Sequence, residues 1–88
     1  MYVHLGGNCL VRTAEIIGIF SKKENKEFYR LLRNKKGEYY EVIDISEDSA
    51  VDSVILTEKT IYFSAISTTT LQKRINQNLI YHNGGNNG

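Results

Sequence analysis

The sequence predicts one α+β domain, in which a mostly antiparallel sheet of about six short strands packs with two helices. Three observations favour this class. Several short runs alternate with a period of two, most clearly residues 61–66. Two other segments place apolar residues at helical spacing behind residues that cap helix starts. The chain also has only 88 residues, a length that predicts a single domain.

The first residues predict a hairpin followed by a third strand. Residues 2–5 and 9–11 form two short apolar runs on either side of Gly6-Gly7-Asn8, which is a turn signal. Residues 15–20 form a β-branched, apolar run that contains Gly18. A glycine inside a strand predicts a bulge or a close neighbour.

A basic helix is expected next. Ser21 and Glu24 have the spacing of a capping box, so the helix is expected to begin there. Gly37 is a suitable stop after the basic pair at 35–36. The apolar stripe of this helix consists of Phe28, Leu31 and Leu32.

The second half predicts three strands and a second helix. Residues 39–45, 51–56 and 61–66 have strand character, and the last two are expected to pair antiparallel. Ser67 and the threonines after it can cap a helix that ends near Asn78. We expect the domain to span residues 1–81, and residues 82–88, rich in Gly and Asn, to form a flexible tail.

Both faces of the predicted sheet are apolar, with Ile55 and Tyr62 on one face and Val54 and Phe63 on the other. Two helices cannot cover both faces well, so we expect a second copy of the chain to cover one of them. A short chain also has a thin stability margin, which association can raise. The sequence therefore predicts a homo-oligomer.

Charge is distributed unevenly along the chain. The net charge of +1 gives no overall electrostatic reason to bind nucleic acid. Residues 22–36 nevertheless contain seven basic side chains against two acidic ones, and residues 38–58 contain seven acidic side chains and no basic one. A fold that separates these segments would have a positive and a negative side.

The basic segment allows three interpretations. It can neutralise DNA phosphates, for which the candidates are Lys22, Lys23, Lys26 and Arg30, supplemented by Arg12, Lys73 and Arg74. It can contact the next subunit head to tail in a ring, with Lys26, Arg30 and Arg33 facing Glu47, Asp48 and Asp52. It can also be a charged helix surface that only keeps the protein in solution.

Nothing in the sequence predicts catalysis, a metal site or a cofactor. His4 and His82 are the only histidines, and Cys9 is the only cysteine. A zinc site needs several converging ligands, and a lone cysteine is more often a small buried residue. No run approaches the roughly 20 apolar residues of a membrane span. We therefore expect a cytoplasmic protein with no enzymatic activity, small-molecule substrate or membrane partner.

Three runs carry a family resemblance: M-Y-V-H-L-G-G at the start, A-E-I-I-G-I-F-S, and T-I-Y-F-S-A-I-S-T-T-T-L-Q-K-R-I. They resemble the bacterial RemA/RemB-type extracellular matrix regulators, more closely those of the RemB type, over residues 1–76. The resemblance implies a ring-shaped homo-oligomer that binds double-stranded DNA through its phosphate backbone. It also implies activation of the transcription of extracellular matrix (biofilm) genes.

The chain departs from this family at its basic positions. An arginine used by RemA-type members near the third strand falls on Glu15, and the paired arginines of a later loop fall on Asp48 and Ser49. Arg12, Lys73 and Arg74 are the nearest substitutes. The alternative is an oligomeric structural or protein-interaction module of the same fold that does not bind DNA.

Overall fold

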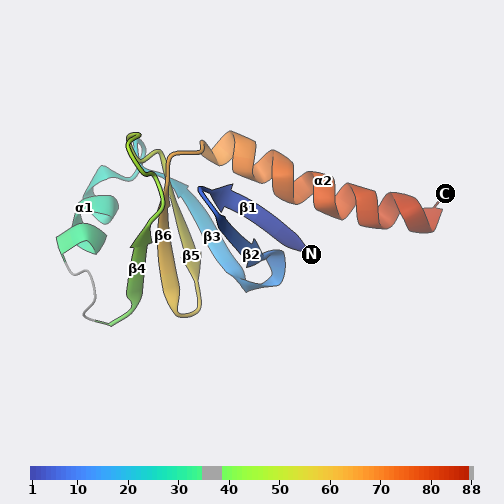
Figure 1. Ribbon diagram of the computed structural model, residues 1–88, viewed down its shortest axis with the longest axis horizontal. Helices are drawn as coiled ribbons and strands as arrows, with labels where there is room; N and C mark the ends of the chain where they lie inside the picture. Colours follow the sequence, from blue (N-terminus) through green and yellow to red (C-terminus); the bar gives the residue numbers. More distant parts are fainter. Residues whose placement is uncertain (35–38, 88) are drawn as a thin grey trace.

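The computed structural model describes residues 1–34 and 39–87 and confirms the α+β class. Within these residues it has six strands, a short 3-10 helix (Thr13–Glu15) and two α-helices (Figure 1). Their bounds are β1 Tyr2–Gly6, β2 Cys9–Arg12, β3 Ile16–Ser21, α1 Lys26–Asn34, β4 Glu41–Asp44, β5 Ser53–Thr57, β6 Thr60–Ser64 and α2 Thr68–Asn87.

The described strands form two sheets. β1 and β2 make the predicted antiparallel hairpin, and the other four strands have the order β3-β5-β6-β4. β5 pairs antiparallel with both β3 and β6, as predicted for β6. β4 runs parallel to β6 and lies on the side of β6 away from β5, although β5 separates β4 and β6 in the sequence. Residue alternation alone carries no information about this order.

The predicted irregularity at Gly18 is confirmed as a bulge. The register of β3 against β5 shifts between Ile16 and Gly18, and Ile17 is 67% exposed. A Cβ atom built at Gly18 would lie 2.9 Å from Cε2 of Phe20, a separation that real Cβ atoms essentially never show. A larger residue at this position would therefore have to displace the Phe20 ring, which lies against Gly18.

The predicted start of α1 at Ser21 is wrong, because α1 begins at Lys26. Ser21 does accept a 3.4 Å hydrogen bond from the Glu24 N–H, but this bond closes a turn. The N–H of Lys22 donates instead to the carbonyl of Asp52 at 3.0 Å, which keeps this residue beside the sheet. The predicted stop at Gly37 lies outside the described residues.

The apolar stripe of α1 is only partly as predicted. Leu32 is buried and Phe28 is half-buried against the sheet, whereas Leu31 is 55% exposed. Phe28 and Leu32 are four residues apart and share a helix face, and Leu31 lies beside that face. Tyr29 contributes to the contact in its place, with its ring centroid 5.0 Å from that of Phe63.

The start of α2 is as predicted, and its end is not. Ser67 Oγ accepts a 3.2 Å hydrogen bond from the Thr70 N–H, which caps the first turn. The helical backbone continues to Asn87, past the predicted end near Asn78. The flexibility expected for residues 82–88 stays a prediction.

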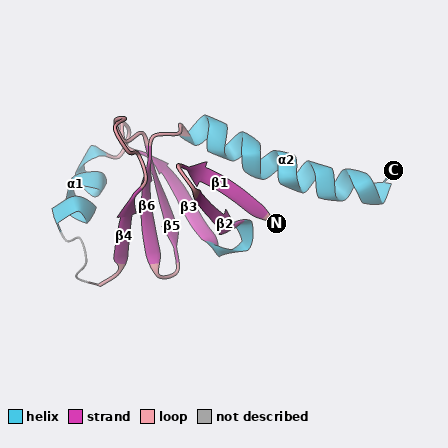
Figure 2. Ribbon diagram, viewed as in Figure 1, coloured by secondary structure: helices cyan, strands magenta, loops and turns pink. Residues whose placement is uncertain are grey.

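One chain covers both faces of the four-stranded sheet. The hairpin and the start of α2 pack on one face, where Leu5, Ile55 and Leu71 are fully buried. α1 packs on the other, over Val54 and Phe63 (Figure 2). A second copy is therefore not needed to cover either face, because the hairpin forms a layer that the prediction did not include; self-association stays a prediction.

Two buried serines join these layers. Ser64 Oγ donates a 2.5 Å hydrogen bond to the carbonyl of Leu5 and accepts one from the Ile66 N–H at 3.0 Å. Ser53 Oγ donates to the carbonyl of Ile66 at 2.6 Å. Both serines are 0% exposed. These bonds attach the hairpin to the sheet and fix the chain where it leaves β6 for α2.

Candidate anion-binding and nucleic-acid interface

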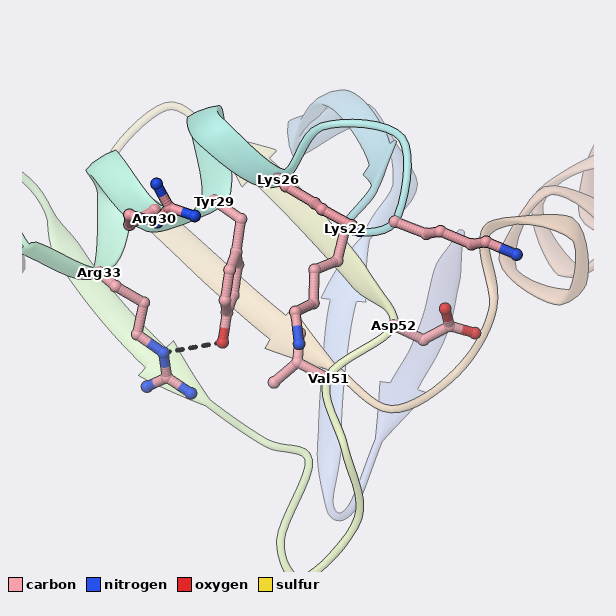
Figure 3. Close-up of a pocket in the computed structure, with 8 residues that line it drawn as sticks. Lys22, Lys26, Tyr29, Arg30, Arg33, Val51 and Asp52 are labelled. Carbon is pink, nitrogen blue, oxygen red and sulfur yellow. Dashed lines mark hydrogen bonds between the residues drawn. The ribbon is translucent and has the colours of Figure 1, made fainter.

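The basic residues of α1 and of the turn before it line an open pocket of about 470 Å³. Figure 3 shows the pocket between α1 and the segment that leads into β5. Tyr29 and Val51 supply its apolar lining. Its charged lining residues are Lys22, Lys23, Lys26, Arg30, Arg33 and Asp52.

Helical spacing places the α1 side chains together. Arg30 follows Lys26 by four residues and Arg33 follows it by seven, so all three lie on one helix face. The opposite wall comes from Val51 and Asp52, just before β5. The 3.0 Å hydrogen bond from the Lys22 N–H to the Asp52 carbonyl joins the two walls through the backbone. The pocket is thus built on fixed elements of the fold.

The cations of this pocket differ in how far they are neutralised. Arg33 forms a 3.0 Å ion pair with Asp44, and Arg30 forms one of 2.9 Å with Glu27 on the open surface. Within the described part of the chain, the ammonium groups of three lysines have no carboxylate at ion-pair distance: Lys22, Lys23 and Lys26. The pocket therefore carries uncompensated positive charge.

Arg33 is held in place by Tyr29 as well as by Asp44. Its Nε donates a 2.7 Å hydrogen bond to the Tyr29 hydroxyl. Partial burial would lower the pKa of the Arg33 guanidinium, but the bonds to Tyr29 and Asp44 outweigh burial and raise it. Burial likewise tends to raise the pKa of Asp44, while hydrogen bonds from Ser46 and Arg33 hold it below its ordinary value. The pair is charged at neutral pH.

The other predicted DNA contacts lie on a different side of the molecule. Arg74 Nη1 donates a 2.8 Å hydrogen bond to the carbonyl of His4, which holds α2 against the hairpin. Lys73 and Arg12 are exposed on α2 and β2. These elements cover the face of the sheet opposite to α1 (Figure 1). Arg12, Lys73 and Arg74 therefore do not extend the α1 pocket within one subunit.

The three acidic residues predicted to contact the next subunit, Glu47, Asp48 and Asp52, also lie on two different surfaces. Glu47 and Asp48 are exposed beside a second hollow of about 460 Å³, which the hairpin turn also lines. Asp52 instead lies in the basic pocket. Because Asp44 also pairs with Arg33, the separation of positive and negative sides is incomplete.

Cys9 and His4 do not line the α1 pocket. Cys9 packs against the core between the hairpin and the sheet, which contains Leu5, Ile55 and Leu71. Burial raises the pKa of its thiol, which disfavours the reactive thiolate. His4 Nε2 lies 2.7 Å from the carbonyl of Gly7, within the hairpin. Among residues 1–34 and 39–87, no three side chains of the metal-ligating types converge.

Neither described helix is long and apolar enough to cross a membrane.

Sequence reasoning missed the apolar lining of this pocket. Tyr29 lies three residues after Lys26 and four before Arg33, so helical periodicity could have indicated it. Val51 comes from a segment more than 20 residues away along the chain, and no local pattern connects it with α1. Asp44, the partner of Arg33, was also missed for this reason.

Fold and site together define a small α+β domain with a cationic binding surface. The family model described as Extracellular matrix regulatory protein A-like matches residues 2–75, and the chain belongs to this RemA-like family. A curated relative, Extracellular matrix regulatory protein B of Bacillus subtilis (strain 168), is 34% identical over 79 residues. The match covers 84% of this chain and 89% of the relative. Membership of the RemA/RemB family, expected from the resemblance, is thereby confirmed.

Proposed function

We propose that this protein regulates extracellular matrix genes in the bacterial cytoplasm, as a DNA-binding homo-oligomer without catalytic activity. Family membership and the name of the Bacillus relative support the regulatory role. The observation that carries the DNA-binding part is the group of three unpaired lysines around α1: Lys22, Lys23 and Lys26.

The proposed contact is made with the DNA backbone. Lys22, Lys23, Lys26 and Arg30 offer ammonium and guanidinium donors to phosphate oxygens, and each contact releases condensed counterions from the duplex. Backbone contacts position a protein on DNA but do not read its bases. Sequence preference then arises from the shape and flexibility of the duplex.

The α1 surface compensates for the missing family arginines. Glu15, Asp48 and Ser49 are all exposed and carry negative or no charge, so they offer no attraction to phosphate. Arg12, Lys73 and Arg74 face away from α1, and in this proposal they contribute only where neighbouring subunits bring both surfaces against one duplex.

Self-association, as a ring, multiplies these contacts. Because the sheet is already covered, the surfaces available for association are exposed apolar side chains, notably Leu10 (62% exposed) on the hairpin and Ile17 (67%) at the bulge. The charges favour a head-to-tail arrangement, since Glu47 and Asp48 lie on a different surface from α1. Repeated subunits would present the α1 lysines at regular spacing.

The direct test is a titration of fluorescently labelled duplex DNA with the whole protein at low and at moderate salt. We expect saturable binding at 50 mM salt that weakens by an order of magnitude or more at 200 mM, as about two or more phosphate contacts require. A Lys59→Ala variant, altered in the β5–β6 turn, should bind as the wild type does. Undetectable binding at low salt would remove the DNA claim.

A second candidate function is a ring that binds a protein partner and uses α1 for contacts between subunits. The exposed Glu47 and Asp48 favour it, because they could meet Lys26 and Arg30 of the next copy. Charge reversal with Lys26→Glu and Arg30→Glu separates the candidates. Loss of DNA binding at an unchanged native mass supports the DNA function, whereas dissociation of the oligomer supports the second candidate.

A further inference from the structure

The α1 pocket has an apolar lining that contact with DNA phosphates does not use. Phosphate oxygens need only the cations, whereas Tyr29 and Val51 line the space between them. Its volume of about 470 Å³ is within the range of about 300–1,000 Å³ that is usual for small-molecule sites. A pocket of this size and composition suits a ligand with both an anionic and a flat apolar part.

We infer that this pocket binds a nucleoside phosphate. The phosphates face the ammonium groups of Lys22 and Lys26 and the guanidinium of Arg30, and the ring system contacts Tyr29 and Val51. Asp52 is exposed at the rim, and Figure 3 shows its carboxylate directed away from Tyr29. A phosphate chain alone would leave the lining unused, and an uncharged nucleoside would leave the lysines uncompensated.

The lining is fixed before any ligand binds. The Tyr29 ring packs against Phe63, with centroids 5.0 Å apart, and its hydroxyl accepts the hydrogen bond from Arg33. The Arg33 guanidinium lies 5.4 Å from the centre of the Tyr29 ring and is also tied to Asp44. A ligand therefore meets a Tyr29 ring that is already oriented, which lowers the entropic cost of binding.

The lysines are positioned to respond to an anion. Lys22 Nζ lies over the Tyr29 ring, 5.0 Å from its centre, so this lysine must swing aside for a ligand ring to contact that face of Tyr29. Lys22 and Lys26 have no carboxylate at ion-pair distance in the described chain, so no existing ion pair must break before they bind phosphate. Arg30 would give up only its ion pair with Glu27 to bind phosphate. This pair is weak because the Arg30 and Glu27 side chains are 65% and 86% exposed.

The site stands on this geometry and does not depend on DNA binding. Only its consequence for regulation rests on the proposed function: a ligand in the pocket would occupy Lys22, Lys26 and Arg30 and would compete with DNA for them. Binding must therefore be measured first without DNA, so that failure of this inference and failure of the proposed function remain distinguishable.

The test is an amide NMR titration of the full-length, ¹⁵N-labelled protein with ATP, adenosine and tripolyphosphate as separate probes. We expect saturable ATP shifts in residues 22–33 and at Val51 and Asp52. ATP should bind at least tenfold more tightly than adenosine or tripolyphosphate, because only ATP engages both the lining and the cations. Absence of saturable shifts, or shifts confined to other surfaces, would overturn the inference.

Matched variants test which atoms carry the affinity. Lys22→Ala and Lys26→Ala should each weaken ATP at least tenfold, whereas Lys59→Ala should leave it unchanged; folding of each variant is checked from the dispersion of its spectrum. Equal weakening by Lys59→Ala would indicate general charge attraction and contradict the site. Tripolyphosphate binding as tight as that of ATP would likewise show that the apolar lining contributes nothing.

Discussion

Removing the charge of Asp44 should weaken the fold and strengthen anion binding at the same time. Asp44 accepts hydrogen bonds from the Ser46 N–H at 3.0 Å and from its hydroxyl at 2.5 Å, and it pairs with Arg33 at 3.0 Å. Asp44→Asn preserves the size of the side chain but removes the negative charge. Arg33, on the pocket wall, then has no ion-pair partner among the described residues.

The expected loss of stability is about 1–2 kcal/mol at neutral pH. The ion pair itself contributes less than about 1 kcal/mol, because the Arg33 and Asp44 side chains are 39% and 28% exposed and water screens them. Hydrogen bonds to a charged acceptor contribute about 1.5–3 kcal/mol, part of which an amide retains. The expected loss of stability therefore lies between the contribution of the ion pair and that of the hydrogen bonds.

The pH dependence follows from the lowered pKa of Asp44 in the folded state. A depressed pKa contributes stability that is fully present above the ordinary value of about 3.9 and is lost as pH falls through the folded value. Urea unfolding of the wild type and of Asp44→Asn should thus differ at pH 7 and converge as the pH falls through the folded-state pKa of Asp44, which lies below its ordinary value. A constant difference across this range would refute the ion-pair explanation.

The same variant should bind anions more tightly. If the freed Arg33 contacts one further phosphate, the slope of log affinity for DNA against log salt becomes more negative by about 0.9 for each contacting subunit. A parallel Glu58→Gln variant, which loses an exposed acidic side chain in the β5–β6 turn outside the pocket, is the matched control. Binding is measured under conditions in which Asp44→Asn is fully folded. Weaker DNA binding than that of the wild type would contradict the assignment of Arg33 to the binding surface.

Three further substitutions test the layers that position the pocket, each by urea unfolding. Ser64→Ala leaves the Leu5 carbonyl and the Ile66 N–H without their partner and should cost about 1–3 kcal/mol; a loss under about 0.5 would show that water replaces the hydroxyl. Leu71→Ala should cost about 2–5 kcal/mol because the side chain is fully buried under the hairpin, and near-neutrality would contradict that packing. Gly6→Ala should cost about 1–3 kcal/mol at its φ of 127°, and an unchanged midpoint would show that the turn relaxes.

Local patterns in the sequence predicted most of the elements of this fold. Alternation at Ile61 and Phe63 indicated β6, Gly18 indicated the bulge, and Ser67 indicated the start of α2, because each depends on neighbouring residues alone. The start of α1 could not be predicted in this way. It is delayed because Lys22 is hydrogen-bonded to Asp52, 30 residues away along the chain.

The site was predictable as a set of cations but not as a pocket. Helical spacing alone brings Lys26 and Arg30 together. The opposite wall at Val51 depends on the order of strands in the sheet, which residue patterns do not contain. The separation of Arg74 from α1 has the same origin, since it follows from the hairpin packing on the other face of the sheet.

The central claim, that the lysines around α1 hold DNA phosphates, is tested most directly by the salt dependence of duplex affinity. The wild type and a Lys22→Ala, Lys26→Ala double variant are titrated over the same series of salt concentrations. Each lysine contact contributes about 0.9 to the slope, so the double variant should lose about 1.8 of its magnitude for each contacting subunit. Identical slopes for the two proteins would show that these lysines do not touch the DNA backbone.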